Sequence, residues 1–229
     1  MAKAVALYSG GKDSHYSLVL SYRAGIVPQV LVTAVPRRED SWLFHEVNVL
    51  WSRLHGEAME VPTYFIEVSG KKDEELDELK RGLSSLLDLY QGVDYLITGA
   101  VRSRYQLERF KELAEELGLR LVAPLWGTDE VALLYMESEE LGFIVTSVKA
   151  YCLDYEVLGN PHTAEVLKSL LKAYRECGVS PVGEGGEFET FVIRSPLFRG
   201  RSVAVSKARK VIYPRMYVGY YIIEHAYLI

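Results

Sequence analysis

The stretch "KAVALYSGGKDSHYS", residues 3–17, changes from an apolar run to a flexible and polar one within a few positions. Residues 3–9 predict a short buried strand, and apolar residues recur at helical spacing after Ser14. Two glycines, a lysine, an aspartate and two serines therefore lie where a strand turns into a helix. A strand followed directly by a helix is the first unit of an α/β fold.

The alternation of apolar runs with helical spacing continues to about residue 126. Strands without polar alternation indicate a parallel sheet that helices cover on both faces. We therefore expect an α/β fold with a five-stranded parallel sheet sandwiched by helices, and ligands bound at the carboxyl ends of the strands. The expected strands are 3–9, 27–36, 61–69, 93–100 and 119–126, and the expected helices contain Tyr16 and Val19, then Leu76 to Tyr90, then Leu107 to Leu117.

After Trp126 the alternation of strand-like and helical segments becomes less regular, which predicts a domain boundary near residue 127. The sequence thus predicts two domains, residues 1–126 and a smaller C-terminal α+β domain at 127–229. The expected C-terminal elements are helices near 129–141 and 163–177 and strand-like runs within 142–150, 191–195, 202–206 and 217–223. The apolar end of the chain predicts an added strand or a contact in a homo-oligomer.

Composition limits the class of protein. The chain has 229 residues, is 49% apolar and carries a formal net charge of -5, which argues against a protein whose main task is wrapping nucleic acid. Cys152 and Cys177 form no zinc pattern, no CxxC pair and no disulfide framework, which fits a reducing cytoplasm. No segment approaches the roughly 20 apolar residues of a membrane span, so we expect a soluble cytoplasmic protein without a membrane partner.

The polar turn has the composition of an anion-binding loop. A helix that starts at Asp13 or Ser14 leaves N–H groups without partners, and its dipole favours an anion at that end. The glycines let the backbone wrap closely around a phosphate, and the lysine and serines add a charge and hydroxyls. Asp13 fits either a helix cap or a carboxylate ligand of Mg²⁺. The residues expected at this site are Ser9, Gly10, Gly11, Lys12, Asp13 and Ser14.

An ordinary turn capped by Asp13 is the structural alternative for this loop. Two other phosphate-binding motifs are absent. The pattern GxxxxGK[ST] needs four residues between its two glycines, and this loop does not have them. The pattern GxGxxG is not met either, because "GEGGEF" has Phe188 in place of the last glycine. Ser9 also lacks the GxSxG context of a nucleophile elbow.

"SGGKDS" after the first strand resembles the PP-loop of the HUP-like ATP pyrophosphatases, which cleave ATP between the α and β phosphates. Within that superfamily, "GEGGEFETFV" (183–192) resembles the signature of the diphthine:ammonia ligase family. The stretches "SWLFHEVN" (41–48), "SRYQLERF" (103–110) and "APLWGTDEVALL" (123–134) agree in order and spacing. The resemblance spans about residues 4–200, and Phe188 stands where the family more usually carries a tyrosine.

The resemblance implies an AMP-forming carboxylate–ammonia ligase that uses ATP and Mg²⁺. Its implied partners are translation elongation factor 2 carrying diphthine, and ammonia, without stable binding of nucleic acid. An adenylated carboxylate would react with ammonia to give diphthamide, with AMP and pyrophosphate as further products. Because diphthine carries a trimethylammonium group, its pocket should combine acidic groups with aromatic faces.

The resemblance also implies site residues. Arg109 would reach the α-phosphate or the substrate carboxylate, and Glu187 or Glu184 would orient the substrate cation or ammonia. The implied catalytic residues are Lys12, Asp13, Arg109 and Glu187. Further implied nucleotide contacts are His45 and the backbone near Val35 and Gly99. The implied substrate-binding residues are Ser103, Tyr105, Gln106, Gly183, Glu184, Gly185, Gly186, Glu187, Phe188, Glu189 and Thr190.

Several alternatives stay open at this point. "GEGGEFET" would also suit an exposed hairpin, residues 103–110 a surface helix, His45 a structural histidine and Trp126 a core residue. A tRNA-modifying adenylase, of the thiolase or lysidine synthase type, is the main rival function, because six basic residues and no acid occur in 199–215. A nucleotide-binding sensor without turnover is the second rival.

Overall fold

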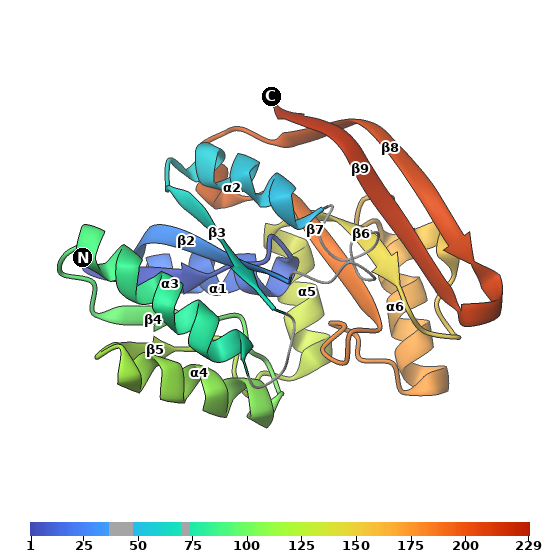
Figure 1. The fold of residues 1–229 in the computed structure, drawn as a ribbon. Helices are drawn as coiled ribbons and strands as arrows, with labels where there is room; N and C mark the ends of the chain where they lie inside the picture. The colour runs from blue at the N-terminus through green and yellow to red at the C-terminus, as the bar shows by residue number, and fades with distance from the viewer. Residues whose placement is uncertain (37–47, 70–73) are drawn as a thin grey trace.

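The computed structural model describes residues 1–36, 48–69 and 74–229, which form two sheets (Figure 1). The first sheet has five parallel strands in the order β3-β2-β1-β4-β5, and the second has four antiparallel strands in the order β7-β6-β9-β8. The predicted five-stranded parallel sheet with a C-terminal α+β part is confirmed.

The strands of the parallel sheet lie where the apolar runs predicted them. β1 is central, and its side chains alternate between two hydrophobic clusters, with Ala4 and Ala6 on one face and Val5 on the other. Both faces are buried, which explains why the sequence shows no polar alternation. The strands are β1 (Ala2–Leu7), β2 (Ile26–Pro36), β3 (Thr63–Val68), β4 (Tyr95–Ile97) and β5 (Arg120–Val122).

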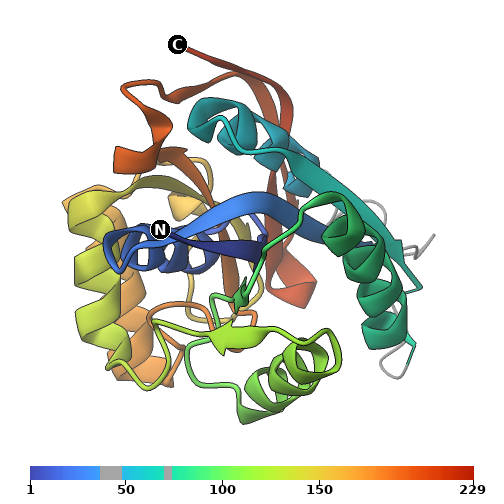
Figure 2. The ribbon, with the colours of Figure 1, turned by 90° about the vertical axis from the view of Figure 1, so that its left-hand side faces the viewer.

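Helices cover both faces of this sheet. Leu83 of α3 and Leu113 of α4 pack with Val5, while Val19 of α1 and Leu54 of α2 pack on the face of Ala4. Figure 2 shows α3 and α4 on one side of the sheet and α1 on the other. The helices are α1 (Lys12–Arg23), α2 (Ser52–Met59), α3 (Glu75–Leu89) and α4 (Arg104–Glu116), with a 3-10 turn at Val49–Trp51 before α2.

The sequence patterns missed α2 and misplaced the start of α1. α1 begins at Lys12 with Gly11 as its N-cap, so Asp13 lies in the first turn and is not the cap. α2 buries Leu54, Ala58 and Met59, but its buried face also carries polar residues such as His55. Apolar spacing alone does not reveal a helix whose buried face is partly polar.

The C-terminal part consists of an antiparallel sheet and two helices. The predicted helices and strand-like runs all correspond to observed elements, although β8 and β9 extend further than predicted. The elements are α5 (Glu130–Glu140), β6 (Gly142–Val148), α6 (Ala164–Cys177), β7 (Phe188–Arg194), β8 (Val203–Tyr213) and β9 (Val218–Leu228), with 3-10 turns at Tyr155–Val157, Pro196–Phe198 and Pro214–Met216.

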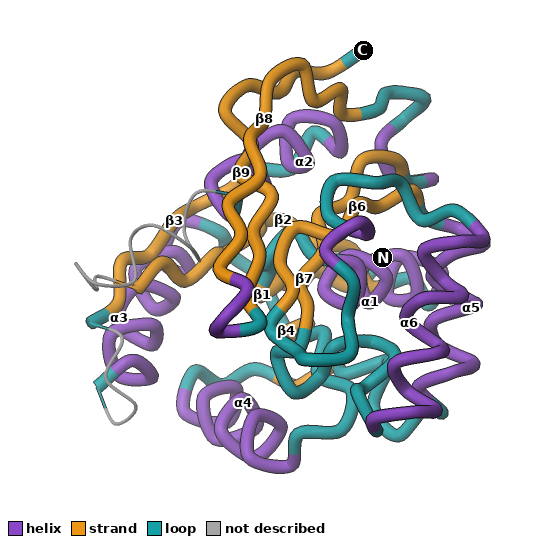
Figure 3. The backbone as a smooth tube through the Cα atoms, turned by 90° about the vertical axis from the view of Figure 1, so that its right-hand side faces the viewer, coloured by secondary structure: helices purple, strands orange, loops and turns teal. Residues whose placement is uncertain are grey.

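The two sheets share one hydrophobic cluster. Ala6 and Val19 belong to the same buried cluster as Phe143 of β6 and Phe191 of β7. The Asn48 side chain bonds to the backbone of β9 at Tyr221 and Ile223, which adds a polar link between the halves. Figure 3 shows β9 beside α2. The proposed boundary near residue 127 therefore stays a prediction. Across the parts of the chain that the structure describes, no helix is long and apolar enough to cross a membrane.

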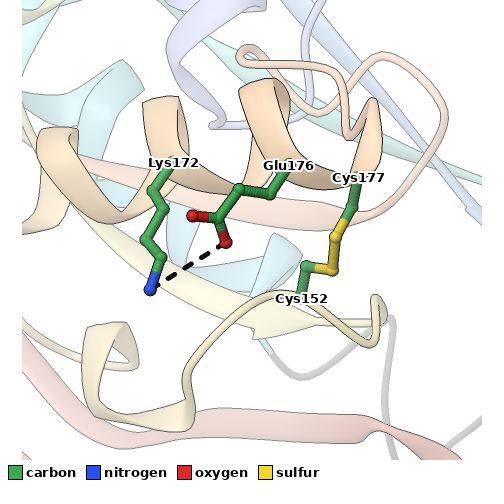
Figure 4. The surroundings of a disulfide bond; sticks show 4 residues. All are labelled: Cys152, Lys172, Glu176 and Cys177. Carbon is green, nitrogen blue, oxygen red and sulfur yellow. Dashed lines mark ion pairs between the residues drawn. A yellow bond between two sulfur atoms is a disulfide. The ribbon is translucent and has the colours of Figure 1, made fainter.

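Cys152 and Cys177 form a disulfide bond, so the expectation of no disulfide was wrong (Figure 4). Cys152 follows β6 and Cys177 is the last residue of α6, and their Cα atoms lie 6.4 Å apart. Their sequence separation of 25 carries no pairing signal, because the fold and not the spacing brings the two cysteines together. Cys177 is exposed at the surface, and Lys172 and Glu176 pair on the same helix.

We expect reduction of this disulfide to lower the free energy of unfolding by about 3.5 kcal/mol, because the bond restricts the unfolded chain. Denaturant unfolding with and without a thiol reductant measures the difference, and alkylation followed by mass spectrometry counts the free thiols. A double variant, Cys152→Ser with Cys177→Ser, serves as the control and should not respond to the reductant. Equal stability of the oxidised and reduced parent protein would contradict the prediction.

Candidate active site

A cavity of about 780 Å³ opens at the carboxyl ends of β1, β2 and β4. Leu7 and Ser9 after β1, Thr33 and Ala34 of β2, and Thr98 after β4 contribute to its lining. Residues of α3, α4 and the 182–191 segment complete it. Its position is the one expected for a ligand of a parallel sheet, and its volume lies in the usual range for small-molecule sites.

The loop after β1 has the form of an anion cradle. Gly10 has a φ of 84°, a conformation that side chains rarely adopt, and Gly11 offers no side chain to the first N–H groups of α1. The hydroxyls of Ser9 and Ser14 lie 3.0 Å apart, and the Ser14 hydroxyl donates to the Gly11 carbonyl. Ser9, Gly11, Asp13 and Ser14 line the cavity, whereas Gly10 and Lys12 do not.

Lys12 lies behind the loop with its side chain fully buried. Its ammonium donates to Asp13 Oδ1 at 2.7 Å and to the Val182 carbonyl at 2.9 Å, and lies 3.1 Å from Glu137 Oε2. Burial lowers the pKa of Lys12, but the carboxylates of Asp13 and Glu137 outweigh this and raise the pKa overall. The ammonium therefore stays charged and is held by three protein oxygens.

Glu137 is a buried carboxylate that the sequence patterns did not single out. Its side chain is fully buried on α5, and burial together with the charge of Asp13 raises the pKa of its carboxyl. One signal was available, because position 137 continues the apolar stripe of Leu133, Leu134 and Leu141 at helical spacing. An acid on the apolar stripe of a helix predicts a buried partner of opposite charge.

Gly99 brings the end of β4 into close contact with the first turn of α1. A Cβ atom on Gly99 would lie 2.7 Å from the Ser14 nitrogen. Gly99 lines the cavity, and its contact with a nucleotide stays a prediction. Val35 does not line it, although Thr33 and Ala34 just before it on β2 do.

The start of α4 presents polar groups to the cavity. Ser103 is the N-cap of α4, and its side chain accepts a hydrogen bond from the Gln106 backbone N–H. Tyr105, Gln106 and Arg109 line the cavity, whereas Ser103 does not. The guanidinium carbon of Arg109 lies 5.1 Å from the centre of the Tyr105 ring. The helix at 104–116 therefore contributes side chains to the cavity, which the alternative of a plain surface helix did not include.

The "GEGGEFET" segment is tied to both helices of the site. Thr190 Oγ1 accepts from the Lys12 backbone N–H at 3.1 Å. Glu184 Oε1 accepts from the backbone N–H groups of Arg102 and Ser103, each at 2.9 Å. These bonds to α1 and α4 argue against the alternative of an isolated, exposed hairpin.

The side chains of this segment divide between the cavity and the segment itself. Glu187 Oε1 accepts from the Ser180 N–H at 3.1 Å, and neither Glu187 nor Gly185 lines the cavity. Glu189 lines it and pairs with Lys149 at 2.7 Å. The cavity-lining members are Gly183, Glu184, Gly186, Phe188, Glu189 and Thr190.

A magnesium site of several protein ligands is not formed in the described residues, where no three His, Cys, Asp or Glu side chains gather as a metal-binding group. Mg²⁺ that accompanies a triphosphate keeps several waters and needs only one or two carboxylates. Asp13 fits that requirement, because its partly exposed carboxylate lines the cavity next to the loop. His45 lies outside the described residues.

Two buried histidines, His15 and His55, lie beneath the loop and were missed in the sequence. The Tyr8 hydroxyl lies 2.7 Å from His15 Nδ1 and 2.6 Å from His55 Nδ1. Burial lowers the pKa of His55 to about 3, and burial together with the neighbouring His55 lowers the pKa of His15 well below its usual value. Both imidazoles are therefore neutral in the folded protein at neutral pH.

We expect the stability of the protein to fall on acidification, and His55→Gln to reduce that fall. The unfolded chain binds a proton at His55 below pH 6.5, whereas the folded protein does so only near pH 3. From pH 6 to pH 4.5 this residue alone should lower the free energy of unfolding by about 2 kcal/mol. The raised pKa of Glu137 acts in the opposite direction in both proteins, so the comparison with the variant cancels it. The variant also removes the effect of His55 on the pKa of His15, which changes the loss in the same direction. Urea unfolding at both pH values tests this, and equal losses in parent and variant would contradict it.

The comparisons with known proteins agree with the two motifs. The family models of the diphthamide synthase N-terminal domain and C-terminal domain match residues 2–121 and 129–229. The diphthine–ammonia ligase of Schizosaccharomyces pombe is 30% identical over 221 residues, which cover 90% of this chain and 36% of that protein. The diphthine–ammonia ligase of Bos taurus is 30% identical over 224 residues, which cover 89% of this chain and 83% of that protein.

This chain thus spans about a third of the fission yeast relative and most of the bovine one. A solved structure, a predicted subunit of tRNA methyltransferase from Methanocaldococcus jannaschii, is similar with a TM-score of 0.45 and 18% identity, over 84% of this chain and 96% of that one. A likeness at this level carries no argument about function.

Proposed function

This chain belongs to the diphthamide synthase family, and from this we propose that it is an ATP-dependent diphthine–ammonia ligase. Its substrate would be translation elongation factor 2 that carries diphthine, and it would act in the cytoplasm. The carboxylate of diphthine attacks the α-phosphorus of ATP and displaces pyrophosphate. Ammonia then attacks the acyl carbon of the adenylate, which releases AMP and leaves diphthamide.

The observation that carries the proposal is that both sequence motifs line one cavity. Ser9 and Gly11 of the loop line it, and so do Phe188 and Thr190 of the glycine-glutamate segment. The hydrogen bond from the Lys12 backbone to Thr190 joins the two motifs directly. A nucleotide bound by the loop would therefore lie next to a diphthine side chain bound by the second segment.

The loop would act on the triphosphate through electrostatics. The N–H groups and dipole of α1 stabilise negative charge as it develops on the departing pyrophosphate. Arg109, whose side chain lines the same cavity, adds a guanidinium suited to a phosphate or a carboxylate. The Lys12 ammonium contributes positive potential from behind the loop, since a direct contact with phosphate would require it to leave Asp13 and Glu137.

Asp13 would hold Mg²⁺, which when bound neutralises part of the phosphate charge. Tyr105 and Phe188 supply aromatic faces, and Glu184 and Glu189 supply acidic groups, for the trimethylammonium group of diphthine. A direct role of Glu187 stays a prediction, because its carboxylate is turned towards Ser180. A homo-oligomer also stays a prediction.

The experiment that tests the proposal is mass spectrometry of the elongation factor after incubation with this protein, ATP, Mg²⁺ and ¹⁵N-labelled ammonium. We expect ¹⁵N in the modified histidine and equal amounts of AMP and amide. AMP without labelled amide would overturn the proposal. Pyrophosphate release with tRNA in place of the elongation factor would favour the rival adenylase instead.

The basic segment at 199–215 does not favour that rival. Arg199 pairs with Glu60 at 2.6 Å, and Lys207 and Arg209 pair with Glu224 at 2.9 and 3.2 Å. Glu60 follows α2 as its C-cap and Glu224 lies on β9, so the absence of acids within the segment itself was misleading. Ion pairing of this kind reduces the positive potential available to a nucleic acid.

A further inference from the structure

Three buried side chains beneath the loop have a single consistent pattern of hydrogen bonds. His55 Nε2 lies 2.7 Å from the Val192 carbonyl, which only accepts, so Nε2 carries the proton and Nδ1 accepts from the Tyr8 hydroxyl. Because that hydroxyl has one hydrogen, His15 Nδ1 must donate to the Tyr8 oxygen. All three side chains are almost fully excluded from solvent.

This pattern closes a ring that passes through the anion-binding loop. Tyr8 continues along the chain to Gly10, whose carbonyl accepts from the Val192 N–H at 3.0 Å. The Val192 carbonyl accepts from His55, and His55 accepts from Tyr8, which completes the ring. The positions of Gly10 and of the β7 backbone are therefore linked through one imidazole.

A second series of hydrogen bonds runs from the Tyr8 hydroxyl to the C-terminal part. His15 Nε2 lies 2.6 Å from the Ser195 hydroxyl, which donates because Nε2 carries no proton in this pattern. Ser195 in turn accepts from the Leu197 N–H at 3.0 Å. These hydrogen bonds join α1 to the 3-10 turn at Pro196–Phe198. Residues of the C-terminal half therefore stabilise the positions of both α1 and the loop.

His55 also supports the loop by direct contact. A Cβ on Gly10 would lie 3.5 Å from His55 Cε1 and 3.2 Å from Ser52 Cβ, so α2 packs closely under the glycine. The His55 ring also stacks on Phe191, with ring centres 4.5 Å apart. The imidazole thus has little freedom to move without displacing Gly10 or β7.

We propose that Tyr8 and His55 are positioning residues for the phosphate-binding loop, which they hold in its cradle shape through the ring with Gly10 and Val192. The consequence for catalysis rests on the proposed function, whereas the consequence for the loop conformation does not. Tyr8 also lines the cavity, whereas His55 does not, and both side chains are buried. The ring also makes the conformation of the loop depend on the position of β7. This strand begins with Phe188 to Thr190, which line the cavity.

Hydrogen exchange of the free protein tests the loop conformation without any ligand. We expect Tyr8→Phe and His55→Gln to speed exchange in residues 9–15 about 10-fold, which corresponds to the loss of one buried hydrogen bond. His162→Gln is the matched control, because His162 also bridges backbone groups, at Phe143 and Ser138, and stacks on Phe143 far along the chain. The control should leave exchange in 9–15 unchanged.

Steady-state kinetics provide the second readout. KM for ATP should rise about 10-fold in both variants, more than kcat falls, and should not change in His162→Gln. If Tyr8→Phe does not fold, His55→Gln decides the question by itself. Unchanged exchange in 9–15, with a loss of thermal stability equal to that of the control, would overturn the proposal. A parent protein that binds no ATP would refute the proposed function and leave the exchange result valid.

Discussion

Gly99→Ala is expected to abolish detectable nucleotide binding and to lower the free energy of unfolding by about 2 to 3 kcal/mol. The new methyl group would lie 2.7 Å from the Ser14 nitrogen, 2.8 Å from its Cα and 3.0 Å from the Asp13 carbonyl carbon. These are backbone atoms, which no rotamer change can move. β4 and the first turn of α1 would have to separate, and the first N–H groups of α1, which we propose bind the phosphates, would shift with the helix.

Calorimetric titration with a non-hydrolysable ATP analogue and urea unfolding measure the two effects. Gly118→Ala is the control, because a methyl group there meets no atom within 4 Å and only the positive φ of 69° opposes it. The control should lose about 1 kcal/mol of stability and keep its affinity. Native affinity in Gly99→Ala would show that α1 does not carry the nucleotide.

Asp13→Asn is expected to reduce the amidation rate by about 100-fold to 1,000-fold with little change in stability. Asparagine keeps the shape of the side chain and an oxygen that can accept from Lys12, so the fold should be retained. The change removes the only carboxylate of the loop that lines the cavity, next to the ammonium of Lys12. The lower amidation rate should therefore come from slower chemical steps and not from unfolding of the protein.

Single-turnover release of pyrophosphate separates adenylation from the later attack of ammonia. We expect both pyrophosphate release and amide formation to slow in Asp13→Asn. Asp94→Asn, an exposed carboxylate just before β4, is the control and should behave as the parent. A variant with parental rates would exclude Asp13 from any metal or phosphate role.

The architecture of the parallel sheet could be predicted from the sequence because burial on both faces produces uninterrupted apolar runs. The same is true of the loop, since its glycines, serines and aspartate mark a turn at a helix start. α2 could not be predicted in this way, because His55 and Ser52 on its buried face are stabilised by tertiary contacts and not by apolar spacing. The Cys152–Cys177 bond was missed for a similar reason, as it depends on where β6 and α6 end.

The motifs themselves indicated which residues belong to the site but not which way they point. The "GEGGEFET" motif named three glutamates, and the structure turns Glu187 into its own segment while Glu184 and Glu189 line the cavity. Likewise "SGGKDS" named Lys12, and only the structure shows its ammonium behind the loop with Glu137.

By itself the sequence of this protein determined the parallel sheet, the place of the anion-binding loop and the family, because these depend on local patterns of apolar and small residues. The tertiary structure alone decided the direction of Lys12, the buried partner Glu137 and the ring of Tyr8, His55 and Val192. The physical reason is that each of these groups is buried together with a partner more than forty positions away in the chain. The stability of a buried charge or imidazole depends on such partners, and a local pattern does not contain them.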